Sequence, residues 1–153
     1  MHSRSTVLAI MLLALLSAAT LGGCSDPKAK AAGTYDVDKV ALKAAAQAHV
    51  KAKGENSPEG QNAAMMAGMI DAMSITLTLN ADGTASMISA MMGQSQTATG
   101  TWTISGSAIT ITASKAGEAP ETVTGTVSGD TITLKPPKGE DMPFDLVMKK
   151  RKG

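Results

Sequence analysis

Cysteine and histidine, the side chains most often used as nucleophiles, bases and metal ligands, are almost absent from this chain. The one cysteine among the 153 residues is Cys24, and the only histidine that follows it is His49. A lone cysteine forms no internal disulfide, and a single histidine without partners completes neither a catalytic triad nor a zinc site. We therefore expect a protein that is not an enzyme and that carries no cofactor.

Methionine is the one abundant side chain with ligand chemistry. Four of the 11 methionines lie close together, namely Met65, Met66, Met69 and Met73. Thioether sulfur is a soft ligand suited to copper(I). Methionine is also a flexible apolar side chain that fills irregular gaps, and three of the four share the face that a helix here would bury. We interpret these residues as packing, with copper(I) binding as the alternative.

The N-terminal segment has the pattern of an export signal. Arg4 supplies a positive charge, residues 7–16 are all apolar, and small residues precede Cys24. An apolar core of this length is too short for a membrane-spanning helix, which needs roughly 20 apolar residues, but it is typical of a cleavable signal.

The cleavage region Leu21-Gly22-Gly23-Cys24 resembles the lipobox of bacterial lipoproteins. The resemblance implies removal of residues 1–23, cleavage between Gly23 and Cys24, and attachment of palmitate-like lipid to Cys24. It also implies a protein anchored to the membrane of the cell envelope. Ser25 directly after the cysteine implies the outer membrane, facing the periplasm, if the source is Gram-negative.

The charge balance and the composition limit the classes of partner that the protein could bind. The chain has 14 basic and 13 acidic residues, so its net charge is +1. This balance argues against a nucleic-acid-binding protein. The only aromatic residues are Tyr35, Trp102 and Phe144.

The first half of the chain after the signal is expected to be a tether, a strand and two helices. Residues 24–32 are small and polar and are typical of a lipidated tether. Residues 33–37 predict a strand that opens the folded domain, residues 33–153. Asp38 is a capping residue for a helix over residues 39–53, which Gly54 would end. Ser57 and Pro58 predict the start of a second helix, which runs to about Met73.

From Ser74 onward the hydrophobic period changes to two. Seven stretches alternate apolar residues with polar ones, mostly threonine, and turns rich in glycine separate them. With the strand at residues 33–37 this makes about eight strands. The sequence predicts a mainly β fold, an antiparallel up-and-down meander that closes into a barrel, with a helical segment inserted after the first strand.

Three short motifs resemble the lipocalin-like (calycin-like) β-barrel domains of bacterial lipoproteins. They are Gly33-Thr34-Tyr35, the turn from Leu79 to Thr84, and Gly100-Thr101-Trp102. The chain departs from true lipocalins in two ways. Their Gly-x-Trp lies on the first strand, where this chain has tyrosine, and they lack the helical insertion. The resemblance implies a small up-and-down barrel, and because of these two departures ligand binding is not carried over from it.

We therefore expect a non-enzymatic binding or interaction domain of the cell envelope. Its partner is either a hydrophobic small molecule inside the barrel or an envelope protein on the rim or helices. The interior decides between them, because a few large side chains could fill a narrow barrel: Trp102, Ile104, Ile109, Ile111 and Phe144. A periplasmic protease inhibitor is a further alternative, since one inhibitor family is a small eight-stranded barrel, although that family carries a disulfide.

Overall fold

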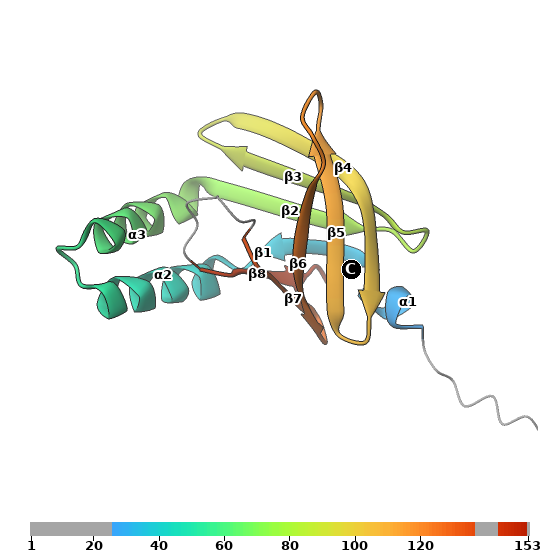
Figure 1. The fold of residues 1–153 in the computed structure, drawn as a ribbon, viewed down its shortest axis with the longest axis horizontal. Coiled ribbons are helices and arrows are strands. Elements are labelled where there is room, and N and C mark those ends of the chain that lie inside the picture. Colours follow the sequence, from blue (N-terminus) through green and yellow to red (C-terminus); the bar gives the residue numbers. More distant parts are fainter. Residues whose placement is uncertain (1–25, 137–143, 153) are drawn as a thin grey trace, which may run out of the picture.

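The computed structural model describes residues 26–136 and 144–152, which form an antiparallel barrel that is closed in chain order (Figure 1). Pairing of the first and last strands, with Asp36 opposite Lys149, completes the closure. This confirms the predicted meander of eight strands with helices after the first strand. The strands are β1 (Gly33–Val37), β2 (Met73–Leu79), β3 (Thr84–Met91), β4 (Gln94–Ser105), β5 (Ala108–Lys115), β6 (Glu121–Ser128), β7 (Thr131–Leu134) and β8 (Leu146–Lys150).

Alternation along the strands decides which side chains fill the barrel. On β2, for example, Ile75, Leu77 and Leu79 are buried while the threonines between them are half-exposed. Successive strand residues point to opposite faces, so one face of each strand supplies the core and the other meets water. Gly100 and Gly125 face inward where neighbouring strands come closest, and a Cβ there would overlap the carbonyl oxygens of Thr112 and Thr133.

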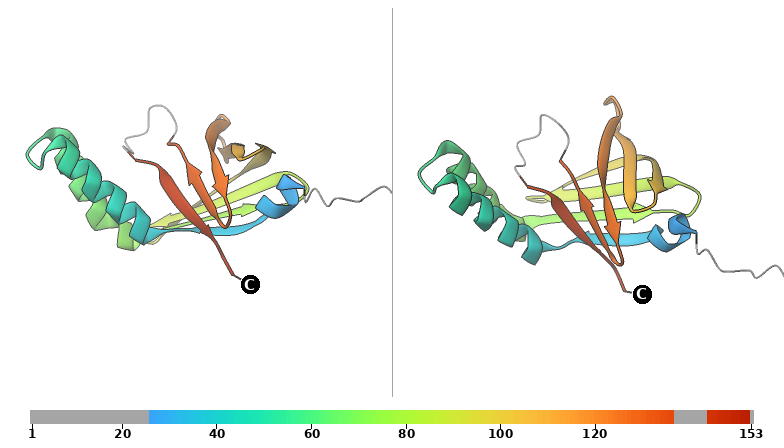
Figure 2. Two further views of the ribbon diagram at one scale, coloured as in Figure 1. Left: turned by 90° about the horizontal axis from the view of Figure 1, so that it is seen from below. Right: turned by 60° about the horizontal axis from the view of Figure 1, so that its bottom comes forward.

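Two long helices follow β1, as predicted. They are α2 (Lys39–Lys53) and α3 (Pro58–Met69), which pack along each other and project from the barrel as a hairpin (Figures 1 and 2). Asp38 caps α2 by accepting hydrogen bonds from two backbone N–H groups, and Ser57 caps α3. The predicted end of the second helix is wrong: α3 stops at Met69, a single 3-10 turn, η1 (Ile70–Ala72), follows, and Met73 already belongs to β2.

Part of the expected tether is a short helix that packs on the barrel. This helix, α1 (Pro27–Ala31), is capped by Asp26, and its last residue, Ala31, is buried. The Tyr35 hydroxyl donates a 2.7 Å hydrogen bond to the Ala31 carbonyl oxygen. Residues 27–31 therefore belong to the folded domain, whose start was predicted only at residue 33.

The two ends of the barrel differ in what surrounds them. One end carries α1 and the β2–β3, β4–β5 and β6–β7 turns, and we refer to it as the closed end. The other carries the α2–α3 hairpin, the β3–β4 turn and the β5–β6 loop, and we refer to it as the open end. Figure 1 shows α1 and the hairpin on opposite sides of the molecule.

Candidate functional site

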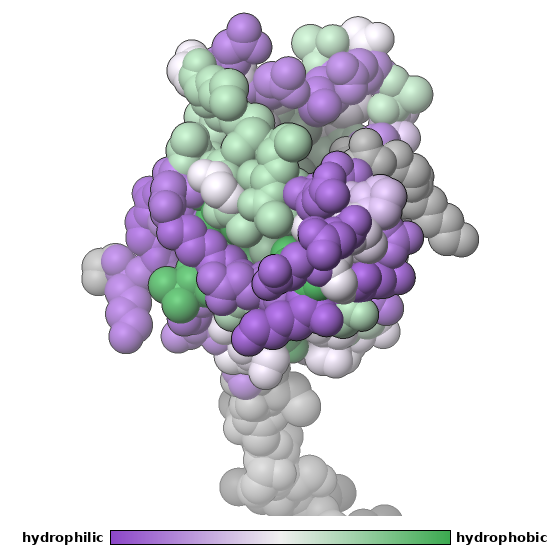
Figure 3. Space-filling view, turned by 90° about the vertical axis from the view of Figure 1, so that its left-hand side faces the viewer, coloured by the Kyte–Doolittle hydropathy of each residue, from purple (hydrophilic) through white to green (hydrophobic). Residues whose placement is uncertain are grey.

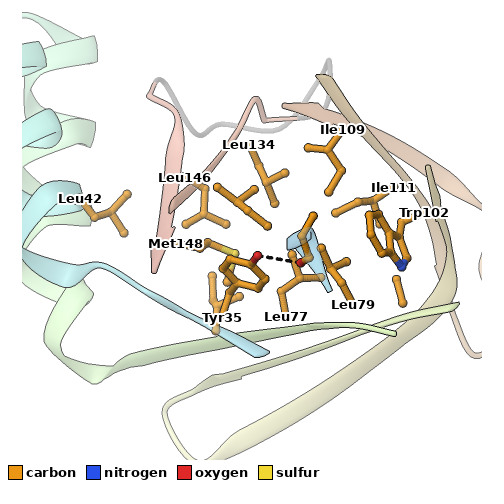
Figure 4. Close-up of a cluster of buried hydrophobic side chains, with 14 of the residues drawn as sticks. Tyr35, Leu42, Leu77, Leu79, Trp102, Ile109, Ile111, Leu134, Leu146 and Met148 are labelled. Atoms are coloured by element: carbon orange, nitrogen blue, oxygen red, sulfur yellow. Dashed lines mark hydrogen bonds between the residues drawn. The ribbon is translucent and has the colours of Figure 1, made fainter. Parts of the chain in front are cut away.

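Side chains fill the closed end. Trp102 on β4 is 1% exposed, and its indole Nε1 donates a 2.9 Å hydrogen bond to the Asn80 carbonyl oxygen in the β2–β3 turn. The Lys28 ammonium of α1 lies 5.7 Å from the centre of the same ring, within the range of a cation–π contact. Figure 4 shows Trp102 beside Ile111 and Leu79.

Tyr35 completes this packing from the opposite wall. Its side chain is fully buried, and its hydroxyl reaches α1 through the bond to Ala31 (Figure 4). The Lys150 ammonium lies 5.8 Å from the ring centre and donates to the Lys30 carbonyl oxygen of α1. Burial raises the pKa of the Tyr35 hydroxyl, with a smaller contribution from the negative charge of Asp130. A neutral, hydrogen-bonded tyrosine thus helps to hold α1 over this end.

The open end contains a cavity of about 200 Å³. Apolar side chains from seven strands, β2 to β8, form most of its wall, and charged residues at or beside the ends of β5, β6 and β7 stand at its mouth. The apolar wall residues are Ile75, Met87, Ala98, Ile111, Ala113, Val123, Leu134 and Leu146, and the charged residues are Lys115, Glu118, Glu121 and Lys135. Ligand cavities are usually apolar with a few polar groups, and this one has that character.

The charges at the mouth balance. Lys115 and Glu118 approach to 3.7 Å as an exposed ion pair, and Glu121 and Lys135 add one charge of each sign. Exposed pairs of this kind contribute little free energy. Among residues 26–136 and 144–152, the charges at the mouth therefore favour neither an anion nor a cation, which leaves selection to the apolar wall.

One further hollow adjoins the cavity along β2 and β3, and a small void adjoins that hollow. A shallow hollow of about 590 Å³ at the rim shares Ile75 and Ser89 with the cavity and includes Met91 and Met92. A small void of about 40 Å³ lies between the helices and the barrel and shares Met73 and Met91 with that hollow. Figure 3, which views the molecule from the hairpin side, shows apolar side chains gathered in a band between polar ones.

The residues predicted to fill the barrel or hold a ligand lie in different parts of the structure. Trp102 and Ile109 are buried in the core, and half-buried Ile104 packs against it. Ile111 is buried in the core and also forms wall of the cavity. Phe144 precedes β8 and contacts the small void by the helices, outside the cavity.

Three of the four predicted methionines come together. Met66, Met69 and Met73 line the small void, whereas the fourth, Met65, is 66% exposed on α3. Met91, expected on the following strand and apart from the helix methionines, is the fourth member of the group. The register could have revealed it, because Met91 is the cross-strand partner of Met73 at the far end of the β2–β3 pair.

Ion pairs at the β1–β8 junction hold the C-terminal basic residues. Arg151 donates two hydrogen bonds to Asp36, and Lys149 lies 2.8 Å from Asp38. The Arg151 guanidinium lowers the pKa of the Asp36 carboxyl, and Lys149 does the same for Asp38. This cluster therefore takes part in barrel closure.

Some predicted features lie beyond what the structure describes. Gly23, Cys24 and the signal, residues 1–23, precede the first described residue. Within residues 26–136 and 144–152, no three histidine, cysteine or acidic side chains form a metal-binding group. No helix in those ranges has the length and apolarity needed to cross a membrane. His49 lies half-buried on α2.

Comparison of the chain with models of protein families, with curated proteins and with solved structures gave no match.

Proposed function

We propose that this protein is a lipid-anchored envelope protein whose lipocalin-like barrel binds a small apolar molecule in its open end. The observation that carries the proposal is the unequal filling of the interior. At the closed end Trp102 and Tyr35 are buried within the core, while the open end contains a cavity of about 200 Å³ with an apolar wall. A barrel that served only as a rigid support would gain stability by filling both ends, because cavities cost packing energy.

The size of the cavity limits the ligand. Sites for drug-sized molecules usually measure about 300–1,000 Å³, and the interior cavity is smaller. The ligand is therefore a small apolar molecule, or a longer one whose remainder lies in the rim hollow that shares Ile75 and Ser89. The balanced charges at the mouth favour a ligand without net charge.

The position of the predicted anchor fits this arrangement. Cys24 precedes Asp26, the cap of α1, by two residues, so a lipid on Cys24 would begin within about 7 Å of that cap. Since α1 packs at the closed end, anchoring would turn that end toward the bilayer. The mouth would then face away from the membrane and take its ligand from the aqueous side.

Lipid attachment is tested by changing the cysteine alone. In the producing bacterium, Cys24→Ala should leave the protein unprocessed or move it from the membrane to the soluble fraction. A Ser25→Ala variant, which keeps the cysteine, serves as the control and should stay membrane-bound. Cleavage before residue 24 with full membrane retention of the alanine variant would contradict the anchor.

Ligand binding is tested by filling the cavity. The fluorescent probe N-phenyl-1-naphthylamine, which is apolar and uncharged, should bind and gain fluorescence. Ala113 on β5 lines the cavity, so Ala113→Leu should weaken probe binding by about tenfold, equivalent to about 1.4 kcal/mol. Ala108→Leu is the matched control, because Ala108 lies on the same strand but is exposed at the closed end. Equal probe binding by both variants would contradict the proposal.

A further inference from the structure

Four methionines line the same small void between the helical hairpin and the barrel. Met66 and Met69 are three residues apart on α3 and so lie on the same side of that helix. Met73 begins β2 and pairs directly with Met91 at the end of β3. All four line the same void of about 40 Å³, which Leu42, Ile70 and Phe144 complete.

This void is unusual for a group of methionines. Interiors are close-packed, and methionine is the side chain best able to adapt to a gap and fill it. Here four of them line a space that is partly open to solvent and larger than the roughly 10–15 Å³ needed for one water molecule. The lining side chains offer a water no oxygen or nitrogen partner, because sulfur is their only heteroatom.

The donors select for one kind of metal ion. Thioether sulfur is soft and favours copper(I), whereas calcium and magnesium require oxygen ligands and zinc takes thiolate, imidazole or carboxylate. The four donors are also uncharged, so a divalent ion would keep its full charge in an apolar setting. Placing a charge in an apolar setting costs free energy, and this cost is smallest for a monovalent soft ion.

The group remains accessible. Met91 is 43% exposed, and the side chains of Met66, Met69 and Met73 are partly exposed. Met73 and Met91 also border the rim hollow of about 590 Å³, which opens to solvent. An ion could therefore reach the void from the rim without the barrel opening.

We propose that Met66, Met69, Met73 and Met91 form a copper(I) site at the junction of α3 with β2 and β3. The site is separate from the barrel cavity and does not depend on ligand binding there. Because its donors come from the hairpin and from the barrel, metal binding would fix α3 to the strands. Copper(I) should therefore raise the melting temperature as well as bind.

The test is a copper(I) titration of the full mature chain under anaerobic, reducing conditions, in competition with the chromophoric chelator bicinchoninate. The parent protein should take up one copper(I) ion per chain. The double variant Met69→Leu, Met91→Leu keeps the side-chain volume and so the fold, but it should weaken binding by about tenfold or more, as even outer-shell changes at metal sites commonly do.

The matched control is Met65→Leu, because Met65 lies on the same helix but is exposed and does not line the void. Its affinity for copper(I) should equal that of the parent, and circular dichroism should show both variants folded. Three results would overturn the proposal. They are no one-to-one uptake by the parent, uptake that survives in the double variant, and an equal loss in Met65→Leu, which would indicate adsorption to surface methionines.

Discussion

The closed and open ends of the barrel are built from the same strands but differ in how their interiors are packed and covered. At the closed end, the polar atoms of Trp102 and Tyr35 each have a hydrogen-bond partner, and α1 covers them. At the open end, the same strands leave an apolar cavity behind a mouth of balanced charges. We therefore expect the closed end to contribute more to the stability of the barrel than the open end does.

The largest difference between the ends should appear when a wall residue is truncated. Trp102→Ala should lower the free energy of unfolding by about 3–5 kcal/mol, because it empties a filled site. Val123→Ala should cost about 1 kcal/mol, since Val123 is half-buried and already borders the cavity. The free energy of unfolding of Val123→Ala can be measured by urea unfolding followed by Trp102 emission. Because Trp102→Ala has no tryptophan, circular dichroism is used to compare the two variants. Emission from native Trp102 should be blue-shifted. Equal costs for the two variants would mean that the ends are packed alike.

Enlarging a side chain at each end tests the same difference in packing by the opposite change. Ala85→Leu at the closed end should destabilise the protein by about 1–3 kcal/mol, because Ala85 is buried in a filled region. Ala113→Leu places the same extra atoms into the cavity and should change the stability by less than about 0.5 kcal/mol. Thermal melts of the two variants make the comparison. A large loss in the Ala113 variant would show that the cavity does not exist in solution.

The contact between Tyr35 and α1 should contribute less. Tyr35→Phe leaves the buried Ala31 carbonyl oxygen without its partner and should cost about 1–2 kcal/mol. It should also speed proteolysis near residues 27–31. Thr112→Val removes a threonine–threonine hydrogen bond on the outer face and should cost almost nothing. If Thr112→Val lowered the free energy of unfolding as much as Tyr35→Phe does, the Tyr35–Ala31 hydrogen bond would have no special role in holding α1 on the barrel.

The smallest effect is expected at the β1–β8 junction and depends on pH. The Asp36 carboxyl has a lowered pKa in the folded protein because Arg151 binds it. A lowered folded-state pKa gives stability that is present above the ordinary value, 3.8, and is lost as the pH falls through the folded value. Asp36→Asn should therefore be less stable at pH 7 by under about 1 kcal/mol, given the exposure of the pair.

Thermal melts between pH 7 and pH 2 measure this difference. The gap between parent and Asp36→Asn should narrow below pH 4 and vanish once the folded-state carboxyl is protonated. A gap that stays constant to pH 2 would show that the amide disturbs the barrel in some other way than by losing charge.

The barrel could be predicted from the sequence because its signals are local. A few neighbouring residues are enough to predict the strands, from the period-two alternation after Ser74. The same is true of the helix starts, from the caps at Asp38 and Ser57. The unequal ends could not be predicted in this way, because they depend on which residues meet across the barrel. The role of α1 was missed for the same reason: residues 27–31 are small and polar, and their contacts are with Tyr35, Trp102 and Lys150, which lie far away in the sequence or on other strands. Met91 joins the other methionines only through strand register.

Methyl NMR during titration with N-phenyl-1-naphthylamine tests the central claim most directly, because it locates binding as well as detecting it. We expect shifts for Ile75, Ile111 and Leu134, which line the cavity, and steady signals for Leu79, Ile109 and Ile132, which do not. Ile88 is exposed on the outside of β3 and reports adsorption to the surface. Shifts confined to Ile88, or no shifts at saturating probe, would contradict the claim that the open end is a binding site.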